Sequence, residues 1–154
     1  MEILLKKAVL SDCKKIHQMQ TIGFQDLLER YQDFDTNPGA ETLKRIEQRF
    51  QNPQIDHYFV QCEAKDIGYI RIRKLDEKTY RISQLFILPI YQNNGYAQQA
   101  IRQAEALYPQ AAGWILDTIK QEEKLCHLYE KMGYRLTGEK RNIKRGMDLV
   151  TYRK

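Results

Sequence analysis

The sequence predicts an α/β (α+β) fold in which a mixed, mostly antiparallel sheet of about seven strands is flanked by about four helices. Three observations favour this class. Three apolar, β-branched segments follow one another between short turns, a strand-helix-strand unit comes next, and a hairpin closes the chain. At 154 residues the chain can bury one substantial core, so we expect a single domain over residues 1–154.

The N-terminal part predicts a strand over about 2–9 and a helix that runs to about Tyr31. Ser11-Asp12 opens this helix, because the pair offers an N-cap oxygen and a negative charge to the first turn. Apolar residues then recur at helical spacing, although Gly23 weakens the middle of the helix or marks a bend. A second helix is expected over about 40–51, where an Asn-Pro pair ends it.

Strands are predicted over about 57–64, 67–75 and 79–88, and the short turns between them indicate an antiparallel meander. A helix from Gly95 to Tyr108 and a strand at Trp114–Thr118 follow. A strand-helix-strand unit of this length is expected to pair its strands in parallel through a right-handed crossover.

The C-terminal part predicts a helix from Glu122 to Met132, because its apolar residues share one face. Gly133 is the expected stop of this helix. A hairpin of strands at about 134–143 and 147–153 completes the sheet.

The junction after Leu85-Phe86-Ile87-Leu88 is the most informative stretch. This unbroken apolar run predicts a strand covered on both faces, and Pro89 ends it. The first N–H groups of the helix that follows have no partner inside the helix, and its dipole adds positive charge, so anions bind such ends. Gly95 lets the backbone approach a bulky phosphate, while Asn93 and Asn94 tolerate unusual backbone angles and offer side-chain donors. The junction therefore predicts a pyrophosphate site.

Two segments of the chain match one family. Gln92-Asn93-Asn94-Gly95-Tyr96-Ala97 fits an acetyl-CoA loop of the form Gln or Arg, two variable residues, Gly, one variable residue, then Gly or Ala. Downstream, Leu128-Tyr129-Glu130-Lys131-Met132-Gly133-Tyr134 fits a second family segment in the right order. On these residues the chain resembles the GCN5-related N-acetyltransferase (GNAT) family over nearly its whole length.

The resemblance implies a GNAT-like acyl-CoA N-acyltransferase fold with acetyl-CoA as co-substrate and no metal. The backbone of Phe86, Ile87 and Leu88 would pair with the pantetheine arm, and a bulge there would aim an N–H at the thioester oxygen. The cofactor's diphosphate would lie on the loop, whose residues are Gln92, Asn93, Asn94, Gly95, Tyr96 and Ala97.

Tyr129 is the catalytic residue that the resemblance implies. A phenol with a reference pKa near ~10 stays neutral and can protonate a thiolate leaving group of pKa near ~8.5. Considered without the family, Tyr129 is better explained as a packing residue, because it shares an apolar face with Leu125 and Leu128.

The chain departs from the family pattern at two positions. Glu122 stands where the family often has an Asn that contacts the cofactor, and Ser83 and Gln84 stand where a general-base Glu is common. No base can be assigned from the sequence. Asp117 is a candidate substitute or water holder, although a strand-end Asp more often bonds a nearby turn. Deprotonation through a water chain would also suffice.

The expected acceptor is a primary amine of a small molecule or peptide, and polyamine, aminoglycoside, amino acid and protein N-terminus all stay open. Asp26, Glu29, Asp33 and Asp35 suggest a cationic acceptor, yet solvation of a polar loop explains the same residues. The oligomeric state is equally open, and a homodimer is compatible with the sequence.

Composition narrows the function classes. The three cysteines are odd in number and far apart, which indicates reduced thiols in a cytoplasmic protein. No apolar run approaches the ~18 residues of a membrane span. The histidines show no metal spacing, and no Walker, GxSxG or GxGxxG motif supports a nucleotidase, hydrolase or Rossmann function.

Two alternative functions stay open at this point. A non-catalytic acyl-CoA-binding module on the same scaffold would explain the missing Glu and Asn. Nucleic-acid binding would use the late basic residues, but a solvated hairpin explains these residues better, so we expect no nucleic-acid partner, and we expect no membrane partner. These basic residues are Lys140, Arg141, Lys144, Arg145, Arg153 and Lys154.

Overall fold

The computed structural model describes all 154 residues and contains one seven-stranded sheet in the order β1-β2-β3-β4-β5-β7-β6. All neighbouring strands are antiparallel except β4 and β5, which confirms the predicted mixed sheet and the parallel crossover. The strands are β1 (Leu4–Lys7), β2 (Ile55–Cys62), β3 (Lys65–Lys74), β4 (Thr79–Ile87), β5 (Gly113–Ile119), β6 (Arg135–Lys144) and β7 (Met147–Arg153).

Five α-helices are present where about four were expected. They are α1 (Cys13–Gly23), α2 (Gln25–Tyr31), α3 (Leu43–Phe50), α4 (Tyr96–Leu107) and α5 (Glu123–Lys131), and short 3-10 turns lie at Leu10–Asp12, Pro38–Ala40 and Pro89–Tyr91. Gly133 has φ +93 just beyond α5, which confirms the predicted stop.

The expectation of one continuous helix to Tyr31 was wrong, but the division falls directly after Gly23, where a bend was expected. Phe24, with φ −109 and ψ 5, separates α1 from α2. A Cβ on Gly23 would lie 2.6 Å from Cδ1 of Phe86, so the glycine lets the end of α1 lie close to the sheet. The predicted cap also differs: the carboxylate of Asp12 accepts the N–H of Val9 at 2.8 Å and closes the 3-10 turn before α1.

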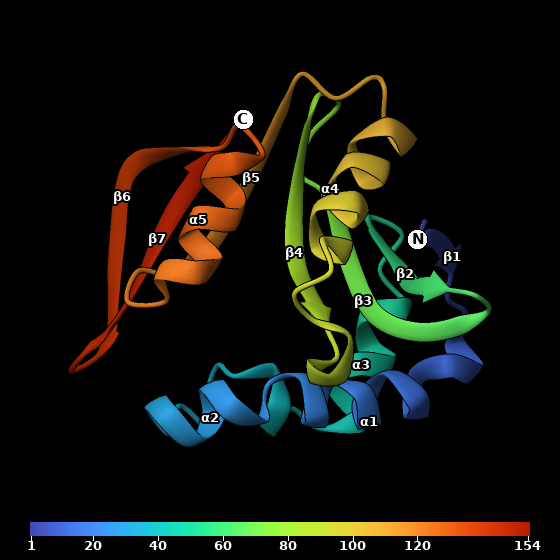
Figure 1. Cartoon of the computed structure of the whole chain (residues 1–154), viewed down its shortest axis with the longest axis horizontal. Coiled ribbons are helices and arrows are strands. Elements are labelled where there is room, and N and C mark those ends of the chain that lie inside the picture. Colours follow the sequence, from blue (N-terminus) through green and yellow to red (C-terminus); the bar gives the residue numbers. More distant parts are fainter.

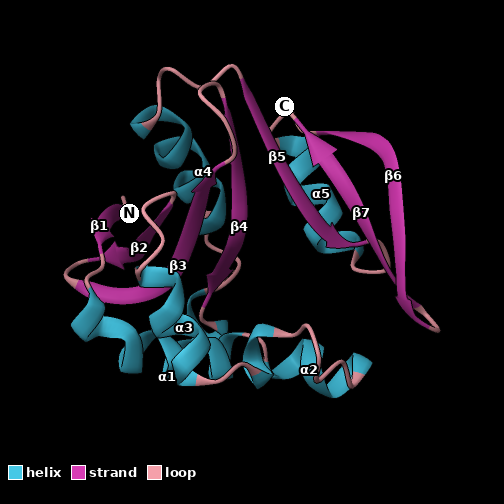
Figure 2. Ribbon diagram, turned by 180° about the vertical axis from the view of Figure 1, so that it is seen from behind, coloured by secondary structure: helices cyan, strands magenta, loops and turns pink.

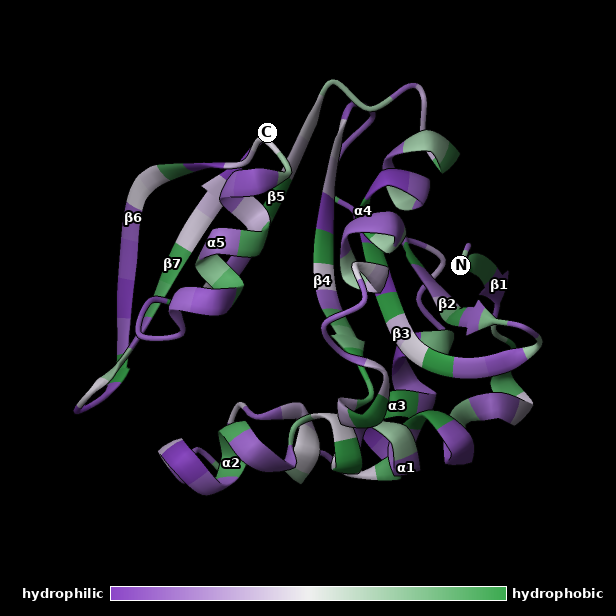
Figure 3. Ribbon diagram, viewed as in Figure 1, coloured by the Kyte–Doolittle hydropathy of each residue, from purple (hydrophilic) through white to green (hydrophobic).

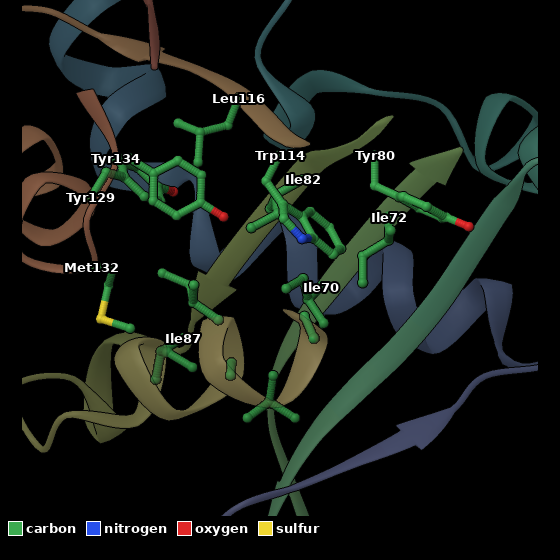
Figure 4. Packing of buried hydrophobic residues seen from close by; sticks show 14 of the residues in the cluster. Ile70, Ile72, Tyr80, Ile82, Ile87, Trp114, Leu116, Tyr129, Met132 and Tyr134 are labelled. Atoms are coloured by element: carbon green, nitrogen blue, oxygen red, sulfur yellow. The ribbon is translucent and has the colours of Figure 1, made fainter. Parts of the chain in front are cut away.

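The helices cover the two faces of the sheet with separate cores (Figures 1 and 2). Helices α4 and α5 share the larger core, in which Ile82, Trp114, Leu116 and Tyr129 lie close together (Figure 4). Helices α1 and α3 bury the opposite face of the sheet against a smaller cluster that includes Phe86. Each face of β3 and β4 is therefore covered, as the apolar run predicted.

The C-terminal hairpin forms as predicted, with β6 at the edge of the sheet. Almost every residue of β6 is exposed, and its surface is mostly hydrophilic (Figure 3). The late basic side chains Lys140, Arg141, Lys144 and Arg145 are all exposed there. No helix has both the length and the apolar character needed to span a bilayer.

Strands β4 and β5 pair only over Thr79–Arg81 and Gly113–Ile115. Beyond these pairs the two strands diverge, as Figures 1 and 2 show. The edge of β4 from Ile82 to Ile87 therefore has no strand partner on the side of β5, which exposes backbone groups that a sheet would normally pair.

The close approach of β3 to β4 predicts the effect of one substitution. A Cβ on Gly68 would overlap the carbonyl oxygen of Phe86, which is backbone and cannot rotate away. We expect Gly68→Ala to lower the free energy of unfolding by about 1–3 kcal/mol in urea titrations. The control is Gly113→Ala, whose Cβ would meet only the flexible end of Arg153. Equal losses in both variants would contradict this reading of β3.

The buried His57 predicts a pH dependence of stability. Its ring stacks on Phe50 at 3.7 Å and its Nδ1 lies 2.5 Å from the hydroxyl of Tyr69. Burial lowers the pKa of His57 from 6.5 to about 4, because the charged ring loses hydration.

Between pH 6.5 and about 4 the unfolded chain therefore binds a proton that the folded chain does not bind. The free energy of unfolding falls as the pH falls through this range, by on the order of 3 kcal/mol. Urea titrations at pH 7.5 and pH 4.5 measure this loss. His57→Phe keeps the ring stack and removes the titration, so its loss between the two pH values should be smaller. An unchanged loss would assign the acid sensitivity to other groups.

Candidate active site

The free edge of β4 offers backbone groups from alternate residues. The N–H of Leu88 donates to the carbonyl of Ile67 at 2.8 Å, which fixes the alternation of the ladder. Phe86 and Leu88 thus direct their N–H groups to β3, whereas Leu85 and Ile87 direct theirs away from it. The backbone pairing expected for Phe86 and Leu88 is therefore taken up by β3, and that for Ile87 stays a prediction.

A bulge lies in β4, but earlier than expected. The register between β3 and β4 shifts where Ile72 faces Ile82 and Arg71 faces Gln84, which leaves Ser83 as the extra residue. The expectation of a bulge at Phe86–Leu88 was therefore wrong. A bulge bends and twists its strand and redirects the local N–H groups. Here it lies where β4 loses its partner β5.

Consecutive backbone N–H groups at the start of α4 have no acceptor within the chain. They belong to Asn93, Asn94, Gly95, Tyr96, Ala97 and Gln98. Asn93 (φ 67) and Gly95 (φ 77) adopt the left-handed conformation that curves the loop into the helix. A Cβ on Gly95 would meet nothing within 4 Å, so the space beside these N–H groups is open. The loop therefore has the geometry of an anion site.

Side chains hold this loop in place. Nε2 of Gln92 donates to the carbonyl of Ile87 at 2.8 Å, and Nδ2 of Asn94 donates to the carbonyls of Tyr91 at 3.0 Å and Gln92 at 3.1 Å. The Asn94 donors expected for the anion are therefore used within the loop. Tyr96 and Ala97 pack their side chains against the larger core and contribute only backbone N–H groups to the loop surface.

Lys124 on α5 is a site residue that the sequence analysis missed. Its Nζ donates to Oδ1 of Asn93 at 2.5 Å, which brings a positive charge to the open N–H groups. It also lines a hollow of about 560 Å³ on the outer face of α5. No spacing rule connects positions 93 and 124, because their contact depends on how α5 lies beside the loop.

Tyr129 lies on α5 in the larger core, 7% exposed, with its ring near that of Tyr134 (Figure 4). Its hydroxyl makes no hydrogen bond within the chain, whereas Tyr134 donates to Glu105 at 2.8 Å and Tyr152 donates to Glu130 at 2.6 Å. Burial, and to a lesser extent the neighbouring Cys126, raises the pKa of Tyr129 to about 12. Tyr129 therefore both packs and keeps a neutral hydroxyl with a proton to donate.

The carboxylates of Glu122 and Asp117, which the sequence analysis considered, both have hydrogen-bond partners within the chain. Glu122 accepts Nη1 of Arg30 at 2.6 Å and the hydroxyl of Tyr31 at 2.5 Å, so it ties α2 to the start of α5. Asp117 accepts Nη1 of Arg81 at 3.1 Å and the hydroxyl of Thr151 at 2.6 Å. Neither carboxylate is free to take a proton from an amine without losing these partners.

Two of the four acidic side chains of the first helical region are also paired within the chain. Asp26 forms an ion pair with Arg30 at 2.7 Å, and the carboxylate of Asp33 accepts the N–H and hydroxyl of Thr36. Glu29 and Asp35 are exposed. The paired Asp26 and the exposed Glu29 and Asp35 fit the solvated-loop explanation better than a cationic acceptor site, whereas Asp33 is buried and holds the turn to Thr36.

The cysteines are unpaired, with Cys13 and Cys62 buried and Cys126 partly buried, as expected for reduced thiols. No group of three or more His, Cys, Asp or Glu side chains is arranged to hold a metal ion.

Solved structures share this fold over the whole chain. An acetyltransferase from Thermus thermophilus has a TM-score of 0.78 at 14% identity and covers 100% of this chain and 97% of its own. Spermidine N-acetyltransferase from Vibrio cholerae, solved with CoA and spermine, has a TM-score of 0.78 at 18% identity over 99% of this chain and 95% of its own.

The microcin C7 self-immunity acetyltransferase, solved with acetyl-CoA and AMP, has a TM-score of 0.75 at 20% identity over 99% of this chain and 92% of its own. No curated protein matches the sequence closely enough to count as a relative. The model of the acetyltransferase (GNAT) family matches residues 23–134, which contain the loop, the diverging strands and Tyr129. The chain therefore belongs to the acetyltransferase (GNAT) family.

Proposed function

We propose that this protein is an acetyl-CoA-dependent N-acetyltransferase that moves an acetyl group to a primary amine of a small molecule or peptide by direct transfer in a ternary complex. The observation that carries the proposal is the run of open N–H groups at Asn93–Gln98 beside the free edge of β4. We further propose that residues 1–154 act as one domain in the cytoplasm, where unpaired cysteines are the rule.

The donor side of the site is assigned to backbone groups. The open N–H groups and the charge of Lys124 hold a diphosphate, and the N–H groups of Leu85 and Ile87 hold an extended amide-bearing arm as a strand would. Acetyl-CoA carries both features and supplies an activated thioester carbonyl. Two solved relatives in fold were crystallised with acetyl-CoA or CoA, which supports this assignment.

The chemical step needs a proton at the departing sulfur. As the bond between nitrogen and the acetyl carbon forms and the bond between carbon and sulfur breaks, the hydroxyl of Tyr129 protonates the sulfur. Its raised pKa keeps the hydroxyl protonated throughout the neutral range. The proton of the amine leaves to solvent, because the neighbouring carboxylates are engaged with arginines.

Binding of acetyl-CoA tests the donor site. A ligand at a hundred times its Kd adds about 2.7 kcal/mol to stability, so we expect a clear rise of Tm in thermal denaturation. Lys124→Ala should raise the Kd roughly three- to tenfold, more at low salt than at high salt, because it removes a charge beside the diphosphate. Lys120→Ala, which removes a charge from the same hollow without touching the loop, is the control. No rise of Tm at millimolar acetyl-CoA would remove the proposal.

Tyr129→Phe tests the proton donor. We expect kcat to fall by roughly a hundredfold or more while the Kd of acetyl-CoA changes little, because the lost hydroxyl has no structural partner. Release of the CoA thiol measures the rate. Tyr152→Phe is the matched control, since its hydroxyl is already bound to Glu130. An unchanged kcat in Tyr129→Phe would refute this role and leave the acetyltransferase proposal standing.

A second candidate function is a non-catalytic acyl-CoA-binding module. The observation that favours it is the commitment of Glu122 and Asp117 to other side chains, with Ser83 and Gln84 at the free edge of β4. A module of this kind would show the rise of Tm with acetyl-CoA but would release no CoA with any amine of a broad panel.

A further inference from the structure

Two polar side chains, one on β3 and one on β4, face each other, and neither takes part in a salt bridge. Arg71 and Gln84 are directly opposite in the ladder, next to the pair formed by Tyr69 and Phe86. They share the face of the sheet that α1 and α3 cover, because Tyr69 and Phe86 belong to the smaller core. Arg71 and Gln84 therefore extend this core as a polar patch.

Gln84 is 6% exposed, and neither Oε1 nor Nε2 of its side chain has a hydrogen-bond partner. An unsatisfied buried polar atom costs about 1–3 kcal/mol. A glutamine with both ends unsatisfied is thus expensive in a purely structural role. One donor and one acceptor are therefore free on the same side chain.

Arg71 carries a positive charge without an ion pair. Glu41 is a carboxylate whose charge acts on Arg71, but Arg49 binds both of its oxygens and Gln20 donates to one of them. The hydroxyl of Tyr69, the other polar neighbour, is neutral because burial raises its pKa to about 12. Burial lowers the pKa of Arg71, and the positive charge of Arg49 adds to this effect. The polar patch therefore has an uncompensated positive charge.

The patch lies beside the point where transfer would occur. Gln84 directly follows Ser83, the extra residue of the bulge, and β4 has no strand partner on its free side from Ile82 onward. A group bound to Gln84 thus lies next to the redirected backbone of the bulge. The face of the sheet that carries Gln84 is opposite the one on which α4 and α5 pack.

We propose that Arg71 and Gln84 form an acceptor subsite and that the acceptor is an amino carboxylate, a compound with both a primary amine and a carboxylate. The guanidinium of Arg71 and Nε2 of Gln84 donate to the carboxylate, and Oε1 of Gln84 accepts an N–H of the amine. This inference rests on the proposed acetyltransferase function. The same charge disfavours a polycation such as spermidine.

The experiment compares matched acceptors that differ only in the carboxylate. Release of the CoA thiol is followed with a panel of α-amino acids, their carboxamides and spermidine. We expect kcat/KM to be roughly tenfold or more higher for the carboxylates than for the carboxamides, because a charge-assisted hydrogen bond is lost in the latter.

Two substitutions test whether Arg71 and Gln84 cause the preference for carboxylates over carboxamides. Arg71→Gln should bring the ratio of the two kcat/KM values close to one. Gln84→Glu adds a carboxylate opposite Arg71 and should turn the preference toward the carboxamides. Arg81→Gln is the control, because Arg81 is also on β4 but is already paired with Asp117, and it should keep the wild-type ratio.

Stability separates a binding role from a structural one. Arg71 has no ion pair to lose, so the Tm of Arg71→Gln should equal or exceed that of the wild type. A marked fall of Tm would make Arg71 a structural residue and would overturn the inference.

The remaining outcomes are equally decisive. A wild-type enzyme that acetylates carboxylates and carboxamides alike, or that prefers spermidine, overturns the amino-carboxylate inference and leaves the acetyltransferase function intact. If no amine releases CoA, the proposed function fails, and calorimetric titration of the amino acids into the CoA-saturated protein then tests the subsite alone. Binding that Arg71→Gln abolishes supports the subsite, and absence of binding overturns it.

Discussion

The pairing of β4 with β5 ends after Arg81 and Ile115, and the rest of the site depends on this separation. The bulge at Ser83 twists β4 where the pairing ends. Backbone groups of β4 remain unpaired as a result. The first turn of α4 follows the end of the same strand, so its open N–H groups lie along the continuation of this edge.

Salt bridges determine which charged side chains are free to take part in a reaction. Arg30, Arg81 and Arg49 engage the carboxylates of Glu122, Asp117 and Glu41 respectively. Each of these carboxylates would have to give up its contact with an arginine in order to accept a proton from an amine. The chain thus uses its acidic side chains to join elements, since Glu122 links α2 to α5, and leaves the positive charge of Arg71 uncompensated beside the bulge.

Local patterns predicted most of the secondary structure. The meander, the helix after Gly95, the stop at Gly133 and the C-terminal hairpin follow from apolar periodicity and turn residues, which act over a few positions. Gly23 marked the place where the first helix divides, but the bulge at Ser83 was not predicted in place, because it depends on the register of β4 with a second strand. The contact of Lys124 with Asn93 was missed because it depends on how α5 lies beside the loop.

The sequence by itself determined the parts of the site that are local. Gly95 at the start of a helix leaves N–H groups without acceptors wherever that helix lies, and the helical period turns Tyr129 toward the core. Only the tertiary structure decided which polar groups stay free. The carboxylate of Glu122 accepts a hydrogen bond from the hydroxyl of Tyr31, which lies 91 residues away in the chain. Arg71 and Gln84 meet across two strands, where Arg71 finds no carboxylate and Gln84 finds no hydrogen-bond partner. Such outcomes depend on distances between elements, which no pattern of neighbouring residues encodes.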